Sequence, residues 1–256
     1  MREMKKKVLI GGVVLILLGA GLIALSGEFA PHPAPNPAIA SLPLPPGRYA
    51  EHAPYYDIAA NYATSTPLKG SANAAAIAAM QQFIAGEIVQ FKKDGDFASI
   101  TPAEAGQMGL GAGRKETLQI TYLIASSAHT VSYIFTTYED TLGAHGNLFF
   151  HTFTFDTTTG QELALGDLFQ SGSDYLARLS GLARTQLPAI IGGNVSKQML
   201  DQGTTPEDKN FSNFFVDNGD LVILFAPYAV APYAAGPQTL RIPLSSLSDI
   251  LNPQYR

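Results

Sequence analysis

The stretch from Leu221 to Gly236 constrains the fold more than any other part of this sequence. It opens with an unbroken apolar run, Leu221 to Phe225, which is typical of a β-strand covered on both faces. Asn218-Gly219 comes just before the run, and Asn-Gly between apolar segments is the strongest short signal for a β-hairpin. We therefore expect Leu221–Phe225 to occupy a central position in an antiparallel sheet.

After Phe225 the chain breaks into two Pro-Tyr pairs, Pro227-Tyr228 and Pro232-Tyr233. Proline fixes its own φ and donates no backbone N–H, so this segment predicts a stiff loop that cannot continue the sheet. Tyrosines on a rigid loop suit ligand binding because little side-chain entropy is lost on contact. We predict Tyr228, Pro232 and Tyr233 as ligand contacts; the alternative, that they only brace the edge of the sheet, stays open.

The N-terminal residues predict a membrane anchor. Residues 1–7 are rich in Lys and Arg, and residues 8–26 form an uncharged apolar run long enough to cross a hydrocarbon core of about 30 Å. The basic cluster predicts a short cytoplasmic tail, so the rest of the chain is expected outside the cell membrane. The alternative is a signal peptide cleaved after Ser26, although the run is long for one.

The composition of the remaining chain narrows the possible partners. Residues 27–47 are rich in proline and predict an extended linker. The formal net charge is −5, and since the first 26 residues carry +3, the remainder carries −8. An acidic domain is a poor candidate for nucleic-acid binding. The chain has no Cys, which excludes disulfides, thiolate metal sites and cysteine nucleophiles.

We expect residues 48–160 to form an N-terminal α+β subdomain. Alternating apolar residues predict a strand over 56–62, and a stripe of apolar residues predicts a helix over 71–94, capped by Ser71 and stopped by Gly95. A glycine-rich loop is expected over 106–113. Three strands then follow, over 118–124, 131–137 and 148–156, and their short turns predict an antiparallel meander.

We expect residues 161–256 to form a second, C-terminal α+β subdomain. A helix is predicted from a Ser173 cap to Pro188 and Gly192-Gly193, followed by a short helix over 195–201. A hairpin over 211–225, a strand over 239–242 and a closing helical turn over 244–251 complete it. The predicted fold class is α+β, with antiparallel sheets and helices packed on one face.

The sequence carries few of the motifs that reaction chemistry requires. No G-x-S-x-G elbow or H-x-x-x-H helix is present, so we predict no catalytic residue, no metal site and no cofactor. His145 and His151 could approach each other across a hairpin, but a third metal ligand is not evident. His151 shares its strand face with Phe149, Phe153 and Phe155, which favours a neutral core histidine.

A set of motifs in the second half is familiar as a group. These are Gly143-Ala144-His145-Gly146, Phe155-Asp156-x-x-Thr159-Gly160, Leu165-Gly166-Asp167-Leu168-Phe169, Leu221 to Phe225 with Tyr228 to Gly236, and Ile242-Pro243-Leu244. Over residues 55–251 the chain resembles the extracytoplasmic domain of RsiV-type anti-sigma factors, which is also found in PdaC-type peptidoglycan deacetylases. The resemblance implies an exported α+β domain of unknown function, without activity of its own, and some relatives bind lysozyme.

The sequence departs from both of these architectures. Seven residues precede the apolar run and the sequence ends at Arg256, so we expect neither a sigma-binding nor a deacetylase domain in it. The expected function is a membrane-anchored, non-enzymatic binding or sensor domain of the bacterial cell envelope. Its expected ligand is a lysozyme-like protein or a cell-wall glycan, contacted by Tyr228, Pro232, Tyr233 and His145. The alternative is a cell-wall hydrolase that uses His145, His151 and Asp156.

Overall fold

The computed structural model describes residues 42–256, except for 112 and 194. The predicted cytoplasmic tail, membrane anchor and most of the linker lie outside the described residues. Within them, a single helix, α1 (Gly70–Asp94), is long and apolar enough to cross a membrane by length and composition. Its apolar stripe is buried against a β-sheet, so α1 is a core helix of the folded domain.

The larger sheet has five strands in the order β1-β2-β3-β4-β5. Their bounds are β1 Arg48–His52, β2 Tyr56–Asn61, β3 Glu116–Ser126, β4 Thr130–Asp140 and β5 Asn147–Asp156. The sequence therefore predicted β2 to β5 correctly, and the β3–β5 meander is antiparallel as expected. The charged strand β1 was not predicted.

One strand pair corrects the predicted fold class. β2 and β3 are parallel, with Ile58 opposite Leu118 and Ala60 opposite Ile120, so the sheet is mixed and not antiparallel. Parallel neighbours need a long crossover connection, and α1 together with α2 (Pro102–Met108) supplies it. The fold class is therefore α+β with a mixed five-stranded sheet and a second, three-stranded antiparallel sheet.

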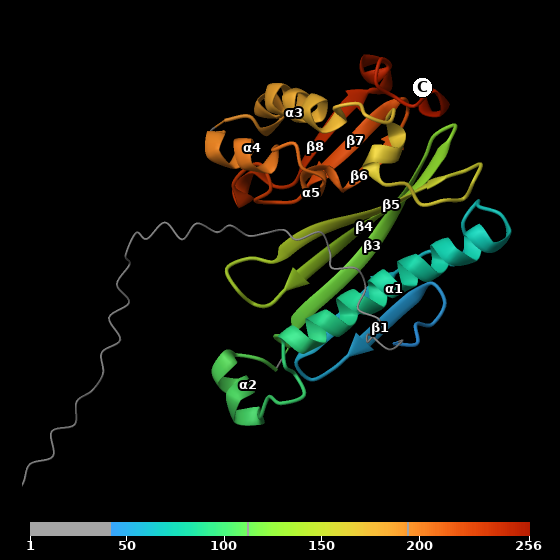
Figure 1. Ribbon diagram of the computed structural model, residues 1–256. Helices are drawn as coiled ribbons and strands as arrows, with labels where there is room; N and C mark the ends of the chain where they lie inside the picture. Colours follow the sequence, from blue (N-terminus) through green and yellow to red (C-terminus); the bar gives the residue numbers. More distant parts are fainter. Residues whose placement is uncertain (1–41, 112, 194) are drawn as a thin grey trace, which may run out of the picture.

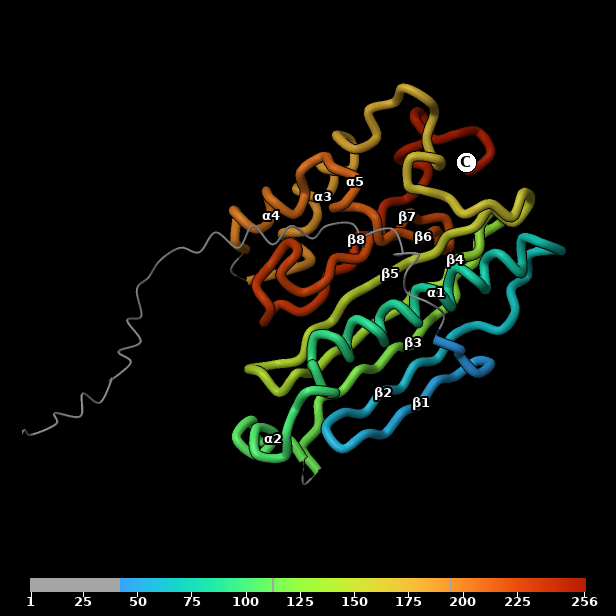
Figure 2. The backbone as a smooth tube through the Cα atoms, turned by 60° about the horizontal axis from the view of Figure 1, so that its bottom comes forward, coloured from blue at the N-terminus to red at the C-terminus, as the bar shows by residue number. Residues whose placement is uncertain are grey.

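The two faces of the larger sheet have different partners, as Figures 1 and 2 show. Alternate residues of β3, β4 and β5 point towards α1 and bury the first core with Met80, Ile84 and Ile88. On the opposite face, the Oγ of Ser132 lies 2.9 Å from Oγ1 of Thr154, and both side chains are buried. The helix α1 therefore covers one face of the larger sheet, and the smaller sheet contacts the other face.

The smaller sheet has the order β6-β7-β8, with β6 Phe214–Asp217, β7 Asp220–Phe225 and β8 Gln238–Pro243. The prediction that Leu221–Phe225 is central and covered is confirmed: Leu221, Val222 and Ile223 have no exposed surface. Asn218 and Gly219 both have positive φ, of 50° and 82°, which is the geometry of a tight hairpin turn. β6 joins the two sheets, because Thr154 Oγ1 donates to the Phe214 carbonyl at 3.1 Å.

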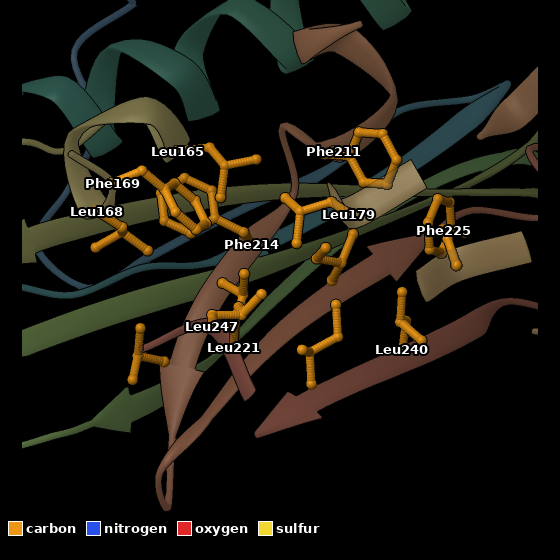
Figure 3. Packing of buried hydrophobic residues seen from close by; sticks show 14 of the residues in the cluster. Leu165, Leu168, Phe169, Leu179, Phe211, Phe214, Leu221, Phe225, Leu240 and Leu247 are labelled. Carbon is orange, nitrogen blue, oxygen red and sulfur yellow. The ribbon is translucent and has the colours of Figure 1, made fainter. Parts of the chain in front are cut away.

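Helix α3 (Tyr175–Ile191) covers the smaller sheet, and Figure 3 shows how its Leu179 packs into the second core. The shorter helices are α4 (Lys197–Gly203) and α5 (Asp208–Phe211), and single 3-10 turns occur at Leu165–Leu168, Tyr233–Ala235, Leu244–Leu247 and Pro253–Tyr255. The second core is built from residues 165–255 and the first from residues 58–155.

Several predicted helix ends are wrong. Helix α1 begins one residue before Ser71, at Gly70, and no side chain caps it. Asp174, not Ser173, caps α3 through the N–H of Ala177, whereas α3 ends at Ile191, immediately before Gly192-Gly193 as predicted, with Pro188 inside its last turn. The predicted glycine-rich loop contains the end of α2, a helix that Thr101 and Glu104 cap reciprocally.

Candidate functional site

The loop between β7 and β8, residues 226–237, carries both Pro-Tyr pairs, and we call it the Pro-Tyr loop. Its middle is anchored in the second core, because Val230 has no exposed surface and Ala231 only 1%. The end of α4 packs directly under it: a Cβ atom on Gly203 would lie 1.9 Å from the Ala229 carbonyl oxygen. The loop is therefore held in place by the fold before any ligand arrives.

Tyr228 has an unusual backbone conformation within this anchored loop. Its φ is +70°, in the left-handed region that a bulky residue rarely adopts, and 49% of its surface is exposed. The backbone turns back at this point, since the Ala229 N–H donates to the Ala226 carbonyl at 3.0 Å. Residues held in strained backbone conformations cluster at functional sites, so the conformation of Tyr228 motivates a functional hypothesis.

His145 reaches the Pro-Tyr loop from the β4–β5 connection. Its ring stacks on Tyr233 with a centroid separation of 3.6 Å and an interplanar angle of 14°. Its Nε2 lies 3.2 Å from the hydroxyl of Tyr228, which is 83 residues away in the sequence. His145, Tyr228 and Tyr233 therefore form one aromatic cluster, which we call the His-Tyr cluster.

Gly146 fixes the orientation of two members of the His-Tyr cluster. Its carbonyl accepts from the Tyr233 hydroxyl at 2.8 Å and lies 3.1 Å from Nδ1 of His145. A carbonyl can only accept, so in the neutral imidazole Nδ1 carries the proton and Nε2 accepts from the Tyr228 hydroxyl. Gly146 itself is closely packed, because a Cβ there would lie 2.3 Å from the Tyr138 hydroxyl.

The structure thus brings three of the four predicted contact residues together. Tyr228, Tyr233 and His145 touch one another, whereas Pro232 is exposed on the same loop, immediately before the 3-10 turn that carries Tyr233. Half-buried rings locked by hydrogen bonds can offer a preformed aromatic surface, with the Tyr228 hydroxyl and ring at its most exposed point.

The residues of the alternative hydrolase site are not brought together. Asn147 and Asp156 are the ends of β5, so His145 and Asp156 lie about 30 Å apart at the rise of an extended strand. His151 lies between them on the α1 face, where its ring stacks on Phe83 at 4.4 Å. Among the described residues, no group of three or more His, Asp or Glu side chains is placed to hold a metal ion.

Asp156 is instead a buried structural carboxylate. Its Oδ1 accepts from the N–H groups of Thr158 at 2.8 Å and Thr159 at 2.7 Å, and its Oδ2 accepts from the Tyr255 hydroxyl at 2.9 Å. Burial opposes ionisation, but these hydrogen bonds outweigh it and hold the pKa of Asp156 below its usual value. The sequence motif signalled the turn but not Tyr255, which is 99 residues away.

A cleft of about 600 Å³ lies at the other end of the smaller sheet. It is bordered by the β3–β4 turn, the β6–β7 turn and the C-terminal residues, which lie side by side in Figure 1. No member of the His-Tyr cluster lines it. Sequence reasoning did not find this cleft, because its walls come from segments that carry no shared motif.

The comparisons with known proteins find a family match within the second half of the chain. Residues 166–245 match the model of a family described as protein of unknown function (DUF3298). The chain therefore carries a DUF3298 domain, as the sequence resemblance implied. This domain holds the whole of β6–β8 and the Pro-Tyr loop.

Two curated relatives extend the likeness. The peptidoglycan-N-acetylmuramic acid deacetylase PdaC of Bacillus subtilis is 31% identical over 199 residues, which are 76% of this chain and 40% of that protein. The immunogenic protein MPT64 of Mycobacterium tuberculosis is 24% identical over 122 residues, 48% of this chain and 52% of that protein. The chain thus spans about half or less of the length of these relatives.

A solved structure supports the fold. A member of the DUF3298 family from Bacteroides fragilis superposes with a TM-score of 0.56 at 22% identity, covering 81% of this chain and 92% of that one. At this identity the likeness shows a shared fold. It extends beyond residues 166–245, so the larger sheet belongs to the shared architecture as well.

Proposed function

We propose that this chain, which carries a DUF3298 domain, is a binding module of the bacterial cell envelope and that its ligand is the glycan of peptidoglycan. The observation that carries the proposal is the His-Tyr cluster, in which an exposed, strained Tyr228 adjoins a stacked His145–Tyr233 pair. The name of one relative supports the choice of ligand, since PdaC is named as an enzyme acting on peptidoglycan.

The chemistry of the cluster suits such a ligand. A sugar ring offers an apolar face together with hydroxyl groups, and tyrosine offers an apolar ring with one hydroxyl at its tip. The ring of Tyr228 lies 5.6 Å from that of Tyr233, centroid to centroid, so the two rings border a common surface. Because the fold already holds the loop in place, less conformational entropy is lost when a ligand binds.

A lysozyme-like protein is the second candidate ligand. The net charge of −8 over residues 27–256 favours a basic protein partner, which would be attracted to the domain. The predicted anchor over residues 8–26 remains part of the proposal, because it would hold the domain beside the cell wall. In this proposal the module binds its ligand without chemically changing it.

The test is co-sedimentation of the purified full chain, kept in detergent, with insoluble peptidoglycan. Binding without release of soluble fragments supports the proposal. Release of fragments that is lost on His145→Ala would favour the hydrolase alternative. Binding to immobilised lysozyme, with no co-sedimentation, would favour the second candidate. If the chain binds neither material, the proposed function is wrong.

A further inference from the structure

The central strand β3 has an open edge along its second half. β2 pairs with β3 only from Glu116 to Ile120, whereas β4 pairs with β3 as far as Ser126. On the side away from β4, residues 121–126 therefore have no neighbouring strand within the described part of the chain. We call this segment the β3 half-edge.

The hydrogen-bond pattern shows which backbone groups face outwards. The Ser127 N–H donates to the Thr130 carbonyl at 2.8 Å, so residues 127, 125, 123 and 121 direct their backbone groups towards β4. Tyr122, Ile124 and Ser126 alternate with them and direct theirs to the open side. No backbone partner for these three is found outside β3 and β4 among residues 42–256, apart from 112 and 194.

The side chains of the half-edge carry none of the usual protection. Leu123 is 73% exposed and Ile124 is 55% exposed, so two of the largest exposed apolar side chains are adjacent here. No Asp, Glu, Lys or Arg occurs anywhere in residues 117–138, and there is no proline. Natural edge strands are normally blunted by charge, proline or a bulge. β1, at the outer edge of the same sheet, does carry charge, at Arg48 and Glu51.

These observations define the kind of partner that fits. A row of free N–H and C=O groups binds an extended strand, and a strand without charge can pair with its own copy without like-charge repulsion. A two-fold axis would satisfy both copies equally, as in the commonest class of homodimer. We propose that the chain dimerises by antiparallel pairing of two β3 half-edges, which joins the two larger sheets into one continuous sheet.

The outward groups fix the register of this pairing. Hydrogen-bonded pairs must form between outward-facing residues, so Ile124 lies opposite Ile124 of the second copy and Tyr122 lies opposite Ser126. Leu123 then lies opposite Ala125. A register centred on Tyr122 would pair Ile120 with Ile124 of the second copy, and it is excluded because β2 already occupies the edge of β3 as far as Ile120. The proposed register forms about six intermolecular main-chain hydrogen bonds, two for each outward pair.

Because the chain has no cysteine, the register can be tested by single cysteine substitutions in the full-length protein. In the proposed dimer the two copies of residue 124 have Cα atoms about 5.5 Å apart, within disulfide range. We expect Ile124→Cys to form a disulfide dimer under mild oxidation at least tenfold faster than Leu123→Cys or Ile190→Cys. Leu123 is the matched control, since it is more exposed than Ile124 but lies out of register with its own copy.

A second pair of variants tests the same register independently. Leu123→Cys mixed with Ala125→Cys should cross-link, while each variant alone should cross-link slowly. Ile124→Lys should abolish the dimer in sedimentation velocity while the circular dichroism spectrum stays that of the wild type, because this side chain is more than half exposed. If Leu123→Cys and Ile190→Cys cross-link as fast as Ile124→Cys, or if none of the variants gives a dimer, the proposal is wrong.

Discussion

At the scale of single residues, Asp156 is the buried carboxylate that holds the C-terminal Tyr255 by a hydrogen bond. It is 1% exposed and holds the turn after β5 as well as Tyr255. We expect Asp156→Asn to lower the free energy of unfolding at pH 7 by about 1.5–3 kcal/mol, the usual contribution of hydrogen bonds to a charged group. Chemical denaturation of the two proteins at pH 7 measures the difference.

The pH dependence of that difference has a definite sign. The folded-state pKa of Asp156 is lowered, so its ionised form contributes stability above its unfolded pKa of about 3.9. That contribution is lost as the pH falls through the folded pKa, where the folded carboxylate also becomes protonated. We therefore expect the stability gap between wild type and Asp156→Asn to narrow below pH 4, and a gap that widens there would contradict this role.

Tyr228 offers a second test at this scale, because its φ of +70° strains any residue other than glycine. Tyr228→Gly and Tyr228→Ala both remove the ring, but only glycine adopts this φ without strain. We expect the Gly variant to be more stable than the Ala variant by about 1–2 kcal/mol in denaturant titrations. If the Ala variant is equally stable, Tyr228 does not hold this conformation in solution.

At the scale of secondary-structure elements, the close packing of the end of α4 against the Pro-Tyr loop fixes the position of the loop. A Cβ on Gly203 would lie 1.9 Å from the Ala229 carbonyl oxygen, and backbone cannot yield as a side-chain tip can. We expect Gly203→Ala to lower the free energy of unfolding by about 1–3 kcal/mol.

The matched control for Gly203→Ala is Gly181→Ala in the middle of α3, where a Cβ meets nothing within 4 Å. Alanine favours a helix interior, so this control should be neutral or stabilising by up to about 1 kcal/mol. If both variants melt at the wild-type temperature, the close approach of α4 and the loop is not present.

The elements also show what the sequence could and could not predict. Periodicity found β3, β4 and β5, and the unbroken apolar run at Leu221–Phe225 correctly placed β7 in the centre of its sheet. Periodicity carries no information about the direction of a neighbour, so the parallel β2–β3 pair was missed. The order strand, helix, strand around α1 was the available signal, since such a crossover favours a parallel pair.

Helix α2 was also missed, although the sequence carries a local signal for it. Glycines at 106, 109, 111 and 113 favoured a loop, yet Thr101, Pro102 and Glu104 form the capping pattern of a helix start.

The candidate site was predictable only in part: the Pro-Tyr loop stood out by its composition. His145 was predicted as a contact residue, but its pairing with Tyr228 was not, because no local pattern connects residues 83 positions apart.

At the scale of the whole molecule, the His-Tyr cluster is supported by the two hydrophobic cores and by the hydrogen bonds that join β5 to β6. His145 comes from the larger sheet and the two tyrosines from the smaller one, so the cluster exists only when both sheets are in place. A variant that separates the larger sheet from the smaller sheet should therefore also lose ligand binding at the His-Tyr cluster.

The central claim is that Tyr228 is a ligand contact and not a structural brace. The decisive measurement is the affinity of the full chain for peptidoglycan with wild-type Tyr228 and with Tyr228→Ala, each beside a thermal melt. Ile190→Ala is the control, because Ile190 is similarly exposed, at 46% against 49%, but lies on α3 outside the cluster. We predict that Tyr228→Ala weakens binding by about 2 kcal/mol, roughly thirtyfold in Kd, with little change in melting temperature. A Tyr228→Ala protein that melts far lower yet binds peptidoglycan as tightly as the wild type would contradict the claim.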